Sequence, residues 1–370
     1  MDIAGKKIWQ VAAGLKERNY VDALIEWDVA IIGPGGCGAW PDCAGDLQIH
    51  APGMVPVIKR FCEEMKKGDL VVLRLGTDQV FAVGEVADEK AQWIDDFGDV
   101  DGWDLQIARR VRYLWSHTSV PKIFPARTLK FGPTILSLDS DTVIQWLKEL
   151  EIPKEAWARE LRTLPDSCKS GKPAPLLSPI EIGKCLYDRG ISSDSISSLL
   201  TSIDELSRIA GWYSRTGLNI SEAETIAYLT VPLLKCLGWS PQKMAVELDN
   251  IDIALFDRLP RDNGNLSIVV EAKKLNDPIK VAFSQAAAYA EHEGRDSCQR
   301  LILTDGIKYY VYTRPKSGHF SDRPRAYLNL TRLVEDYPLL HIAGAKDALT
   351  IMAADWSDYQ PSAVVPSEES

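Results

Sequence analysis

The chain has 370 residues, enough to bury a sizeable core, and this length favours two or three domains over one. Its 45% hydrophobic and 25% charged residues are typical of a folded globular protein, which excludes a disordered or fibrous chain. The formal net charge of -10 argues against nonspecific coating of nucleic acid, but a local basic stripe can still steer DNA.

The hydrophobic runs and the cysteines indicate which cellular compartment to expect. No apolar run is long enough to span a bilayer, and the start MDIAGKKIWQ lacks the apolar core of a secretory signal. The seven cysteines are odd in number and form no CxxC pair, which is typical of reduced thiols. We therefore expect a cytoplasmic protein with no membrane partner.

Residues 1–150 form the first predicted domain. The runs KIWQVAA, WDVAIIG, DLVVLRLG and QVFAVGEVA are apolar and β-prone and are bounded by Gly or Asp, so they predict strands. MVPVIKRFCEEMKKGD predicts a helix ending at Gly68, and residues 142–150 predict a closing helix. This mixture indicates a small β-barrel with helical insertions.

A glycine-rich segment follows the second predicted strand. VAIIGPGGCG matches GxGxxG through Gly33, Gly35 and Gly38, the signature of a dinucleotide-binding turn. That turn needs a helix to begin at once, whereas Pro41 and Gly45 make a poor helix start. A binding loop is therefore favoured over a nucleotide-dependent oxidoreductase.

Four possible zinc ligands lie in the same region: Cys37, Cys43, His50 and Cys62. Their spacings do not match the short paired knuckles of structural zinc, and buried free cysteine is common. Free thiols are the favoured interpretation.

The first domain resembles the EVE branch of the PUA-like superfamily through IWQVAAG, residues 61–86 and residues 93–115. The resemblance implies a reader that flips a modified base into an aromatic pocket. A flipped base recovers its stacking from aromatic faces and its hydrogen bonds from polar groups. The candidates for stacking are Trp40, Trp93, Phe97 and Trp103. Asp101 and Asp104 can accept hydrogen bonds from an exocyclic amino group, such as that of cytosine.

A second interpretation applies to these aromatic residues and aspartates, and a separate segment is a candidate for binding DNA. Most of these tryptophans can instead be barrel core, and the aspartates can cap turns. The clearest basic stripe is ARRVRYLW, in which Arg109, Arg110 and Arg112 are candidates for contacting the DNA backbone.

Residues 151–217 are predicted to be a helical connector. A helix is expected over 154–162, the segment CKSGKPAPLLSP suits an exposed linker, and the Ser-rich stretch that follows reads as capped helices. Their apolar faces are expected to pack on a neighbouring domain.

The stretch from Ile251 to Lys274 is the most informative part of the chain. Two apolar runs joined by a segment rich in Pro, Asp, Asn and Gly predict a hairpin. Asp252 begins the first strand, and Glu271 and Lys273 close the second, two residues apart on one face. Two carboxylates and a lysine suit magnesium-assisted phosphodiester hydrolysis, whereas the alternative is an exposed ion pair worth little.

The surrounding segment, from Ile220 to Arg314, resembles the PD-(D/E)XK nuclease superfamily, most closely the nuclease domain of type I restriction motor subunits. The likeness rests on SEAETIAYLTVPLLKCLGW, the hairpin, SQAAAYA, RLILTDG and IKYYVYTR. It implies that Glu222, with Glu224 in reserve, faces the metal from the opening helix. It also implies that Gln285 and Tyr289 form the QxxxY motif, which supports the site or touches DNA.

Together these observations predict an α+β and α/β multidomain protein. It has a PUA-like barrel (1–150), the connector (151–217), a PD-(D/E)XK mixed sheet flanked by helices (218–345) and a partly disordered tail (346–370). The expected function is a modification-dependent DNA restriction endonuclease that uses Mg²⁺, with Mn²⁺ as a substitute, held by Asp252 and Glu271. Double-stranded DNA with a modified base, such as modified cytosine, is the expected partner, and cleavage of both strands suggests a homodimer. The alternative is a non-catalytic reader of modified DNA.

Overall fold

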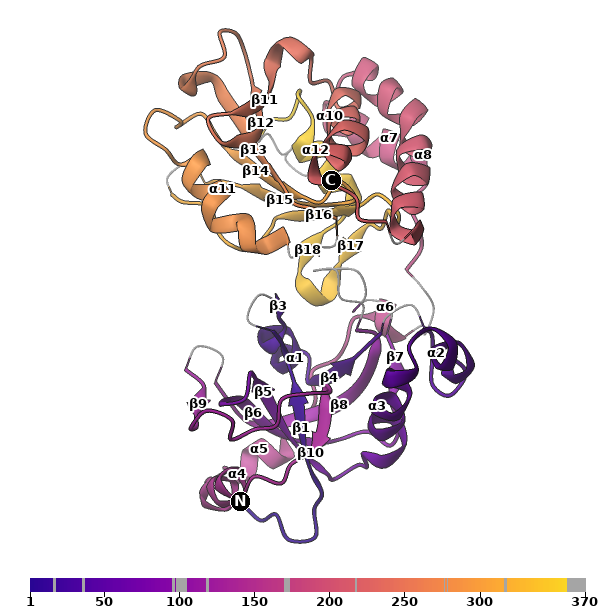
Figure 1. Cartoon of the computed structure of the whole chain (residues 1–370), viewed down its shortest axis with the longest axis vertical. Helices are drawn as coiled ribbons and strands as arrows, with labels where there is room; N and C mark the ends of the chain where they lie inside the picture. The colour runs from indigo at the N-terminus through magenta and orange to yellow at the C-terminus, as the bar shows by residue number, and fades with distance from the viewer. Residues whose placement is uncertain are drawn as a thin grey trace, which may run out of the picture. The chain divides into compact units, whose positions relative to one another are not determined.

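A computed structural model of the chain describes residues 1–15, 18–34, 37–94, 97, 105–117, 120–169, 174–216, 218–275, 277, 279–315 and 318–357. The chain folds into two compact units, Met1–Ala174 and Pro175–Ser370, and each contains a mixed sheet with helices (Figure 1). The predicted mixed multidomain class is confirmed. Among the described helices, none is long and apolar enough to cross a membrane.

The first unit contains ten strands and six α-helices in its described part. The strands are β1 (Ile8–Ala12), β2 (Gly14–Leu15), β3 (Arg18–Asn19), β4 (Val29–Ile32), β5 (Leu70–Leu75), β6 (Gln79–Val86), β7 (Gln92–Trp93), β8 (Ile107–Ser116), β9 (Lys122–Ile123) and β10 (Ile135–Ser137). The helices are α1 (Val21–Glu26), α2 (Ala44–His50), α3 (Val55–Lys59), α4 (Asp141–Glu149), α5 (Lys154–Ala158) and α6 (Asp166–Lys169).

The sheet of the first unit has the strand order β10-β1-β5-β6-β8-β4, with β7 beside β8 and β9 beside β6. β1 runs parallel to β5, while β5, β6 and β8 pair antiparallel. The four predicted strands of this region are confirmed as β1, β4, β5 and β6. The two end strands of this order do not pair with each other in the described residues, so the sheet resembles half of a barrel.

The helix predicted to end at Gly68 stops earlier. α3 continues into a π-helical turn over Arg60–Glu64, and Met65 is extended. The Asp69 carboxylate accepts a hydrogen bond from the Lys66 backbone at 2.9 Å and another from the Trp9 indole at 2.8 Å. Because Asp69 offers the chain a local side-chain partner, the turn competes with further helix at this point.

The second unit contains eight strands and six α-helices in its described part. The strands are β11 (Met244–Leu248), β12 (Ile251–Phe256), β13 (Leu266–Ala272), β14 (Arg300–Thr304), β15 (Lys308–Thr313), β16 (Ala326–Asn329), β17 (Asp336–Tyr337) and β18 (Ile342–Ala343). The helices are α7 (Pro179–Asp188), α8 (Ser193–Thr216), α9 (Glu222–Thr225), α10 (Val231–Cys236), α11 (Phe283–Ala290) and α12 (Ala345–Met352).

The sheet of the second unit runs β11-β12-β13-β14-β15-β16-β18-β17. β13 is a central strand whose seven residues are all buried, and it runs parallel to β14, antiparallel to β12. α11 packs on β13 and β14, on the opposite side of the sheet from α10 and α12 (Figure 1). The hairpin, the two later strands and the SQAAAYA helix predicted from the sequence are confirmed as β12 with β13, β14 with β15, and α11.

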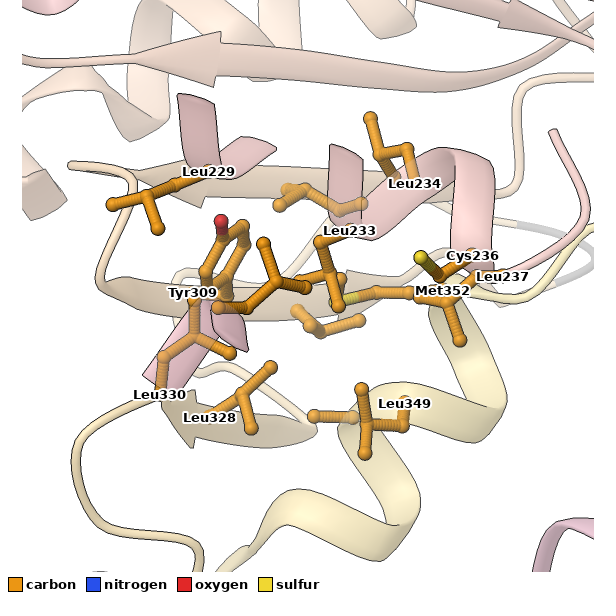
Figure 2. Packing of buried hydrophobic residues seen from close by; sticks show 14 of the residues in the cluster. Leu229, Leu233, Leu234, Cys236, Leu237, Tyr309, Leu328, Leu330, Leu349 and Met352 are labelled. Atoms are coloured by element: carbon orange, nitrogen blue, oxygen red, sulfur yellow. The ribbon is translucent and has the colours of Figure 1, made fainter. Parts of the chain in front are cut away.

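The core of the second unit lies between the sheet and helices α7, α8, α10 and α12. Figure 2 shows the central part, in which Leu233 and Leu237 from the α10 region meet Leu328 from β16 and Leu349 and Met352 from α12. The predicted connector is thus divided: residues up to Ala174 belong to the first unit, and α7 and α8 line the second core. α12 lies within the stretch predicted as a tail.

α7 and α8 form because their starts are capped and their apolar residues follow a helical period. Ser178 and Glu181 make a capping box around Pro179 at the first turn of α7. On α8, Ile196, Leu199, Ile203, Leu206 and Ala210 are buried on one face.

Replacing Ile203, which is buried in the second core, tests the contribution of α8. We expect Ile203→Ala to lower the free energy of unfolding of this unit by about 2–5 kcal/mol because it leaves a cavity. Ile180→Ala is a matched control, since that isoleucine on α7 is 80% exposed and its loss should change stability by no more than about 0.5 kcal/mol. Urea unfolding followed by circular dichroism measures both; equal losses would contradict the packing.

Candidate functional site

The end of the β12–β13 hairpin brings two of the predicted carboxylates to one face. Ile253 pairs with Val270, so continuing the antiparallel register by one residue sets Asp252 opposite Glu271. Residues directly opposite in an antiparallel pair project to the same side. Asp252 also accepts a hydrogen bond from the Ala272 backbone at 2.6 Å, which fixes its carboxylate beside the end of β13.

Glu271 and Lys273 form the centre of this group. The Lys273 ammonium lies 2.8 Å from Glu271 Oε1, while the glutamate is only 3% exposed. The second oxygen, Oε2, is buried and has no hydrogen-bond donor within reach in the described part of the chain. A buried carboxylate oxygen without a donor is costly, which suits a position that a bound cation or a water completes.

Glu222, and not Glu224, lies in the electrostatic field of this group. Glu222 interacts with Asp252 and Lys273, whereas Glu224 accepts a hydrogen bond from the Tyr213 hydroxyl at 3.0 Å. The helical period explains the difference, because side chains two residues apart on a helix point to different faces.

The loop between β14 and β15 positions the helix that carries Glu222. Gly306 has φ +87°, and a Cβ atom there would lie 2.5 Å from the Cβ of Thr225 on α9. Thr225 in turn donates to the Glu222 carbonyl at 2.9 Å. Only glycine permits this backbone to approach α9 so closely, so Gly306 sets the distance between α9 and the sheet.

The electrostatics follow from burial and crowding of carboxylates. Burial raises the pKa of Glu271, with further increases from Asp252 and Glu222, against the lowering effect of Lys273. Burial and the charge of Asp252 also raise the pKa of Glu222. Burial tends to lower the pKa of Lys273, but its bond to Glu271 and the surrounding acids outweigh this, so the net shift is upward. Lys273 is therefore a cation at neutral pH.

The residues present fit a hard divalent cation that keeps part of its own hydration. No group of three or more His, Cys, Asp or Glu side chains in the described ranges is arranged to hold a metal ion. Magnesium is commonly bound by only one or two carboxylates, with waters and substrate phosphate oxygens completing its shell. Asp252 and the unsatisfied Oε2 of Glu271 are such a pair.

The predicted QxxxY pair lies on α11, which packs against β13. Gln285 Nε2 donates to the Tyr289 hydroxyl at 3.0 Å, and Gln285 is exposed while Tyr289 is half-buried. The two side chains interact with each other at the surface of the helix, one turn apart as their spacing predicts.

The predicted base pocket is described only in part. Asp101, Trp103 and Asp104 lie outside the described residues. Phe97 is buried, and Trp93 is half-buried, as in the core interpretation. Trp40 is also half-buried, and its indole donates to Glu63 at 2.9 Å.

The arginines of β8 hold the first unit together. Arg109 has no exposed surface and binds Asp88 at 2.6 Å and the Met65 carbonyl at 2.7 Å, so it does not face a phosphate and we do not carry it forward as a DNA contact. Arg110 donates to the Arg162 carbonyl at 2.5 Å and Arg112 to the Arg159 carbonyl at 2.8 Å. These bonds tie the segment after α5 to the sheet.

The glycine-rich segment after β4 is not followed directly by a helix, since α2 begins only at Ala44. Gly35 lies outside the described residues. Burial and the neighbouring Cys43 raise the pKa of Cys37 to about 12, and burial also raises the pKa of Cys62 to about 12. Both thiols are therefore protonated at neutral pH.

Two structural residues near the sites carried no signal in the sequence. Gly306 follows Asp305 in what reads as an ordinary turn, and its contact with α9 depends on chain far away in sequence. Asp28 is 1% exposed with φ 54° and accepts from Arg159 and from the Arg162 backbone. Its position after Trp27 gave no sign of a buried ion pair.

Comparison with known proteins adds little. No family model and no curated protein matches the chain. One solved structure, "The fragment structure of a putative HsdR subunit of a type I restriction enzyme" from Vibrio vulnificus YJ016, is 20% identical with a TM-score of 0.22. The match covers 31% of this chain and 24% of that chain, so this chain spans about a quarter of that structure. Similarity at this level defines neither the fold nor the function.

Glu222→Gln tests whether burial and the neighbouring carboxylates raise the pKa of Glu222. A carboxyl whose pKa is raised on folding costs stability when it is ionised in both states, and this cost disappears below its unfolded pKa. We therefore expect the variant to melt roughly 1–2 °C above the wild type at about pH 7, with the gain shrinking at about pH 4. Differential scanning calorimetry measures it. Glu224→Gln, which removes a charge on the same helix but keeps an amide oxygen as acceptor for the Tyr213 hydroxyl, is the control and should not show this gain.

Proposed function

We propose that the second unit is a magnesium-dependent phosphodiesterase that cleaves DNA. The single observation that supports it most directly is the buried Glu271, which has one oxygen on Lys273 and the other unsatisfied, beside Asp252 at the end of one hairpin. The sequence resemblance to PD-(D/E)XK nucleases implies the same residues independently of the structure. A purely structural ion pair would not require the additional acids.

Each residue of the group has its own proposed role. Asp252 and Glu271 are the ligands for Mg²⁺ or Mn²⁺, and a bound cation supplies Lewis-acid polarisation of the phosphodiester. Lys273, held as a cation against Glu271, orients water through its ammonium and stabilises charge that develops on the phosphate. Glu222 adds a further acceptor near the site, and its raised pKa suits it to take up a proton.

The first unit is proposed to recognise a modified base, such as modified cytosine, in double-stranded DNA. This rests on the sequence resemblance to EVE domains. A small cavity of about 110 Å³ in this unit is lined by residues including Tyr20, Leu24, Ile31 and Thr134. Its walls are mostly apolar, but it is smaller than the usual small-molecule site and does not include the predicted aromatic residues, so the proposal does not rest on it.

The same geometry admits a second function in which the chain binds modified DNA without cleaving it. The favouring observation is that Lys273 already satisfies one oxygen of Glu271, as in a structural ion pair. The two functions differ in what Asp252 does: a non-catalytic reader retains full biological activity in Asp252→Asn, whereas a nuclease loses activity and keeps DNA binding.

Cleavage assays with matched modified and unmodified DNA test the nuclease. With Mg²⁺, we expect the wild type to cut modified DNA, and Asp252→Asn and Lys273→Met to reduce the rate at least about 100-fold, because each removes transition-state stabilisation. Asp257→Asn is the matched control, since Asp257 is an exposed acid just beyond the other end of β12. Inertness of the wild type toward both DNAs would argue against catalysis.

Cation binding can be tested without any substrate. At about 100 times its Kd, Mg²⁺ should stabilise the wild type by ~2.7 kcal/mol, or roughly 5–10 °C in melting temperature. Asp252→Asn should lose most of this shift and Asp257→Asn should keep it. A shift of the same size in all three proteins would place the cation elsewhere.

The described residues of one chain contain one such carboxylate group, and one group cuts one strand at a time, so we propose a homodimer on DNA for cleavage of both strands. Light scattering with catalytically inactive Asp252→Asn on a duplex substrate should give the mass of two chains. A mass of one chain would oppose the proposal.

A further inference from the structure

An aromatic cluster with two exposed members lies beside α9 and plays no part in the function proposed above. Trp212, near the end of α8, is 50% exposed, and Tyr228, in the π-helical segment Ile226–Thr230, is 58% exposed. An exposed tryptophan ring beside other aromatic rings offers a flat face on which a planar ligand can stack. Tyr213 lies between them: its ring is 5.1 Å from that of Trp212, and it interacts electrostatically with Tyr228.

A hydrogen bond connects this cluster to α9, the helix that carries Glu222. The Tyr213 hydroxyl donates to Glu224 at 3.0 Å, and Glu224 lies on α9 with Glu222, which interacts with Asp252 and Lys273. The aromatic cluster is therefore adjacent to the helix that carries one wall of the site.

The groove beside Trp212 is an open surface along α8 that carries two arginines and two acids. The arginines are the charged residues nearest to the tryptophan, because Arg208, Trp212 and Arg215 follow one another at helical spacing. Arg215 lies over the backbone of Gly211, where a Cβ atom would be 3.1 Å from its Nη1. Asp204 and Glu205 line the other part of the groove, so the basic stretch is short and suits one or two nucleotides.

We propose that Trp212, supported by Tyr228, is a stacking platform for an unpaired nucleotide of the DNA strand, with Arg208 and Arg215 holding the flanking phosphates. The proposal rests on the proposed nuclease function and deepens it, because it makes DNA with unpaired bases, at an end, a flap or an opened duplex, the preferred substrate. Stacking on a tryptophan face is sequence-tolerant because every base has a π-face. The platform therefore adds affinity without adding sequence specificity.

Binding measurements separate this platform from catalysis. In the full chain carrying Asp252→Asn, anisotropy of fluorescein-labelled oligothymidylate, of the same strand with abasic sites and of a duplex of equal length gives three affinities. Adding Trp212→Ala should weaken oligothymidylate binding at least about fivefold and leave abasic and duplex binding nearly unchanged. Trp212→Phe should restore most of the loss. Tyr187→Ala on α7, an aromatic that is more exposed than Trp212 at 68%, is the control and should change nothing.

Two further measurements test the role of the arginines and the effect of the platform on cleavage. Arg215→Gln should reduce the salt dependence of single-strand binding by about 0.7 in log–log slope, as for one lost phosphate contact. In the otherwise wild-type chain, Trp212→Ala should slow cleavage of a flapped substrate more than cleavage of a blunt duplex. The platform is overturned if Trp212→Ala weakens binding of oligothymidylate and of the abasic strand by the same factor. It is also overturned if Trp212→Ala does not weaken oligothymidylate binding. An inert nuclease with intact, base-dependent binding overturns only the catalytic function.

Discussion

The second unit depends on the burial of one carboxylate. Glu271 is the last residue but one of a strand whose residues are all buried, so its charge lies where water cannot fully solvate it. Lys273 compensates one oxygen, and the strand geometry that places the two residues on one face makes this compensation possible. The other oxygen has no hydrogen-bond donor within reach in the described residues, and the proposed cation site rests on this feature.

The remainder of the second unit holds this group in place. The parallel pairing of β13 with β14 brings the β14–β15 turn beside the end of β13, where the Lys273 backbone donates to Thr304 at 2.7 Å. Gly306 in that turn then meets Thr225, and α9 is held with Glu222 toward the acids. α12 secures the other end of the sheet, because Arg300 donates from β14 to the Ile351 and Ala353 carbonyls at 2.8 Å each.

In the first unit, a cluster of arginines in the sequence has a structural role that the sequence did not indicate. Three arginines in eight residues of β8 suggested a phosphate-binding stripe, yet Arg109 is inside the unit and the other two bind backbone carbonyls. A guanidinium has five donors and can satisfy several carbonyls at once, so arginine serves as readily to fasten irregular chain as to bind DNA. Arg208 and Arg215 on α8 of the second unit, in contrast, lie beside the exposed Trp212.

The sequence by itself determined the local elements of this protein and the identity of the central trio. The hairpin from Ile251, the strands around it and α11 follow from period-two and helical patterns, and Asp252, Glu271 and Lys273 follow from spacing within one hairpin. These are short-range properties, because strand geometry alone decides which side chains share a face. The tertiary structure decided the rest: which glutamate of α9 turns to the acids, that α7 and α8 line the second core, and that Arg109 is buried. Each of those depends on contacts between residues distant in the chain, and only the packed fold brings such residues together.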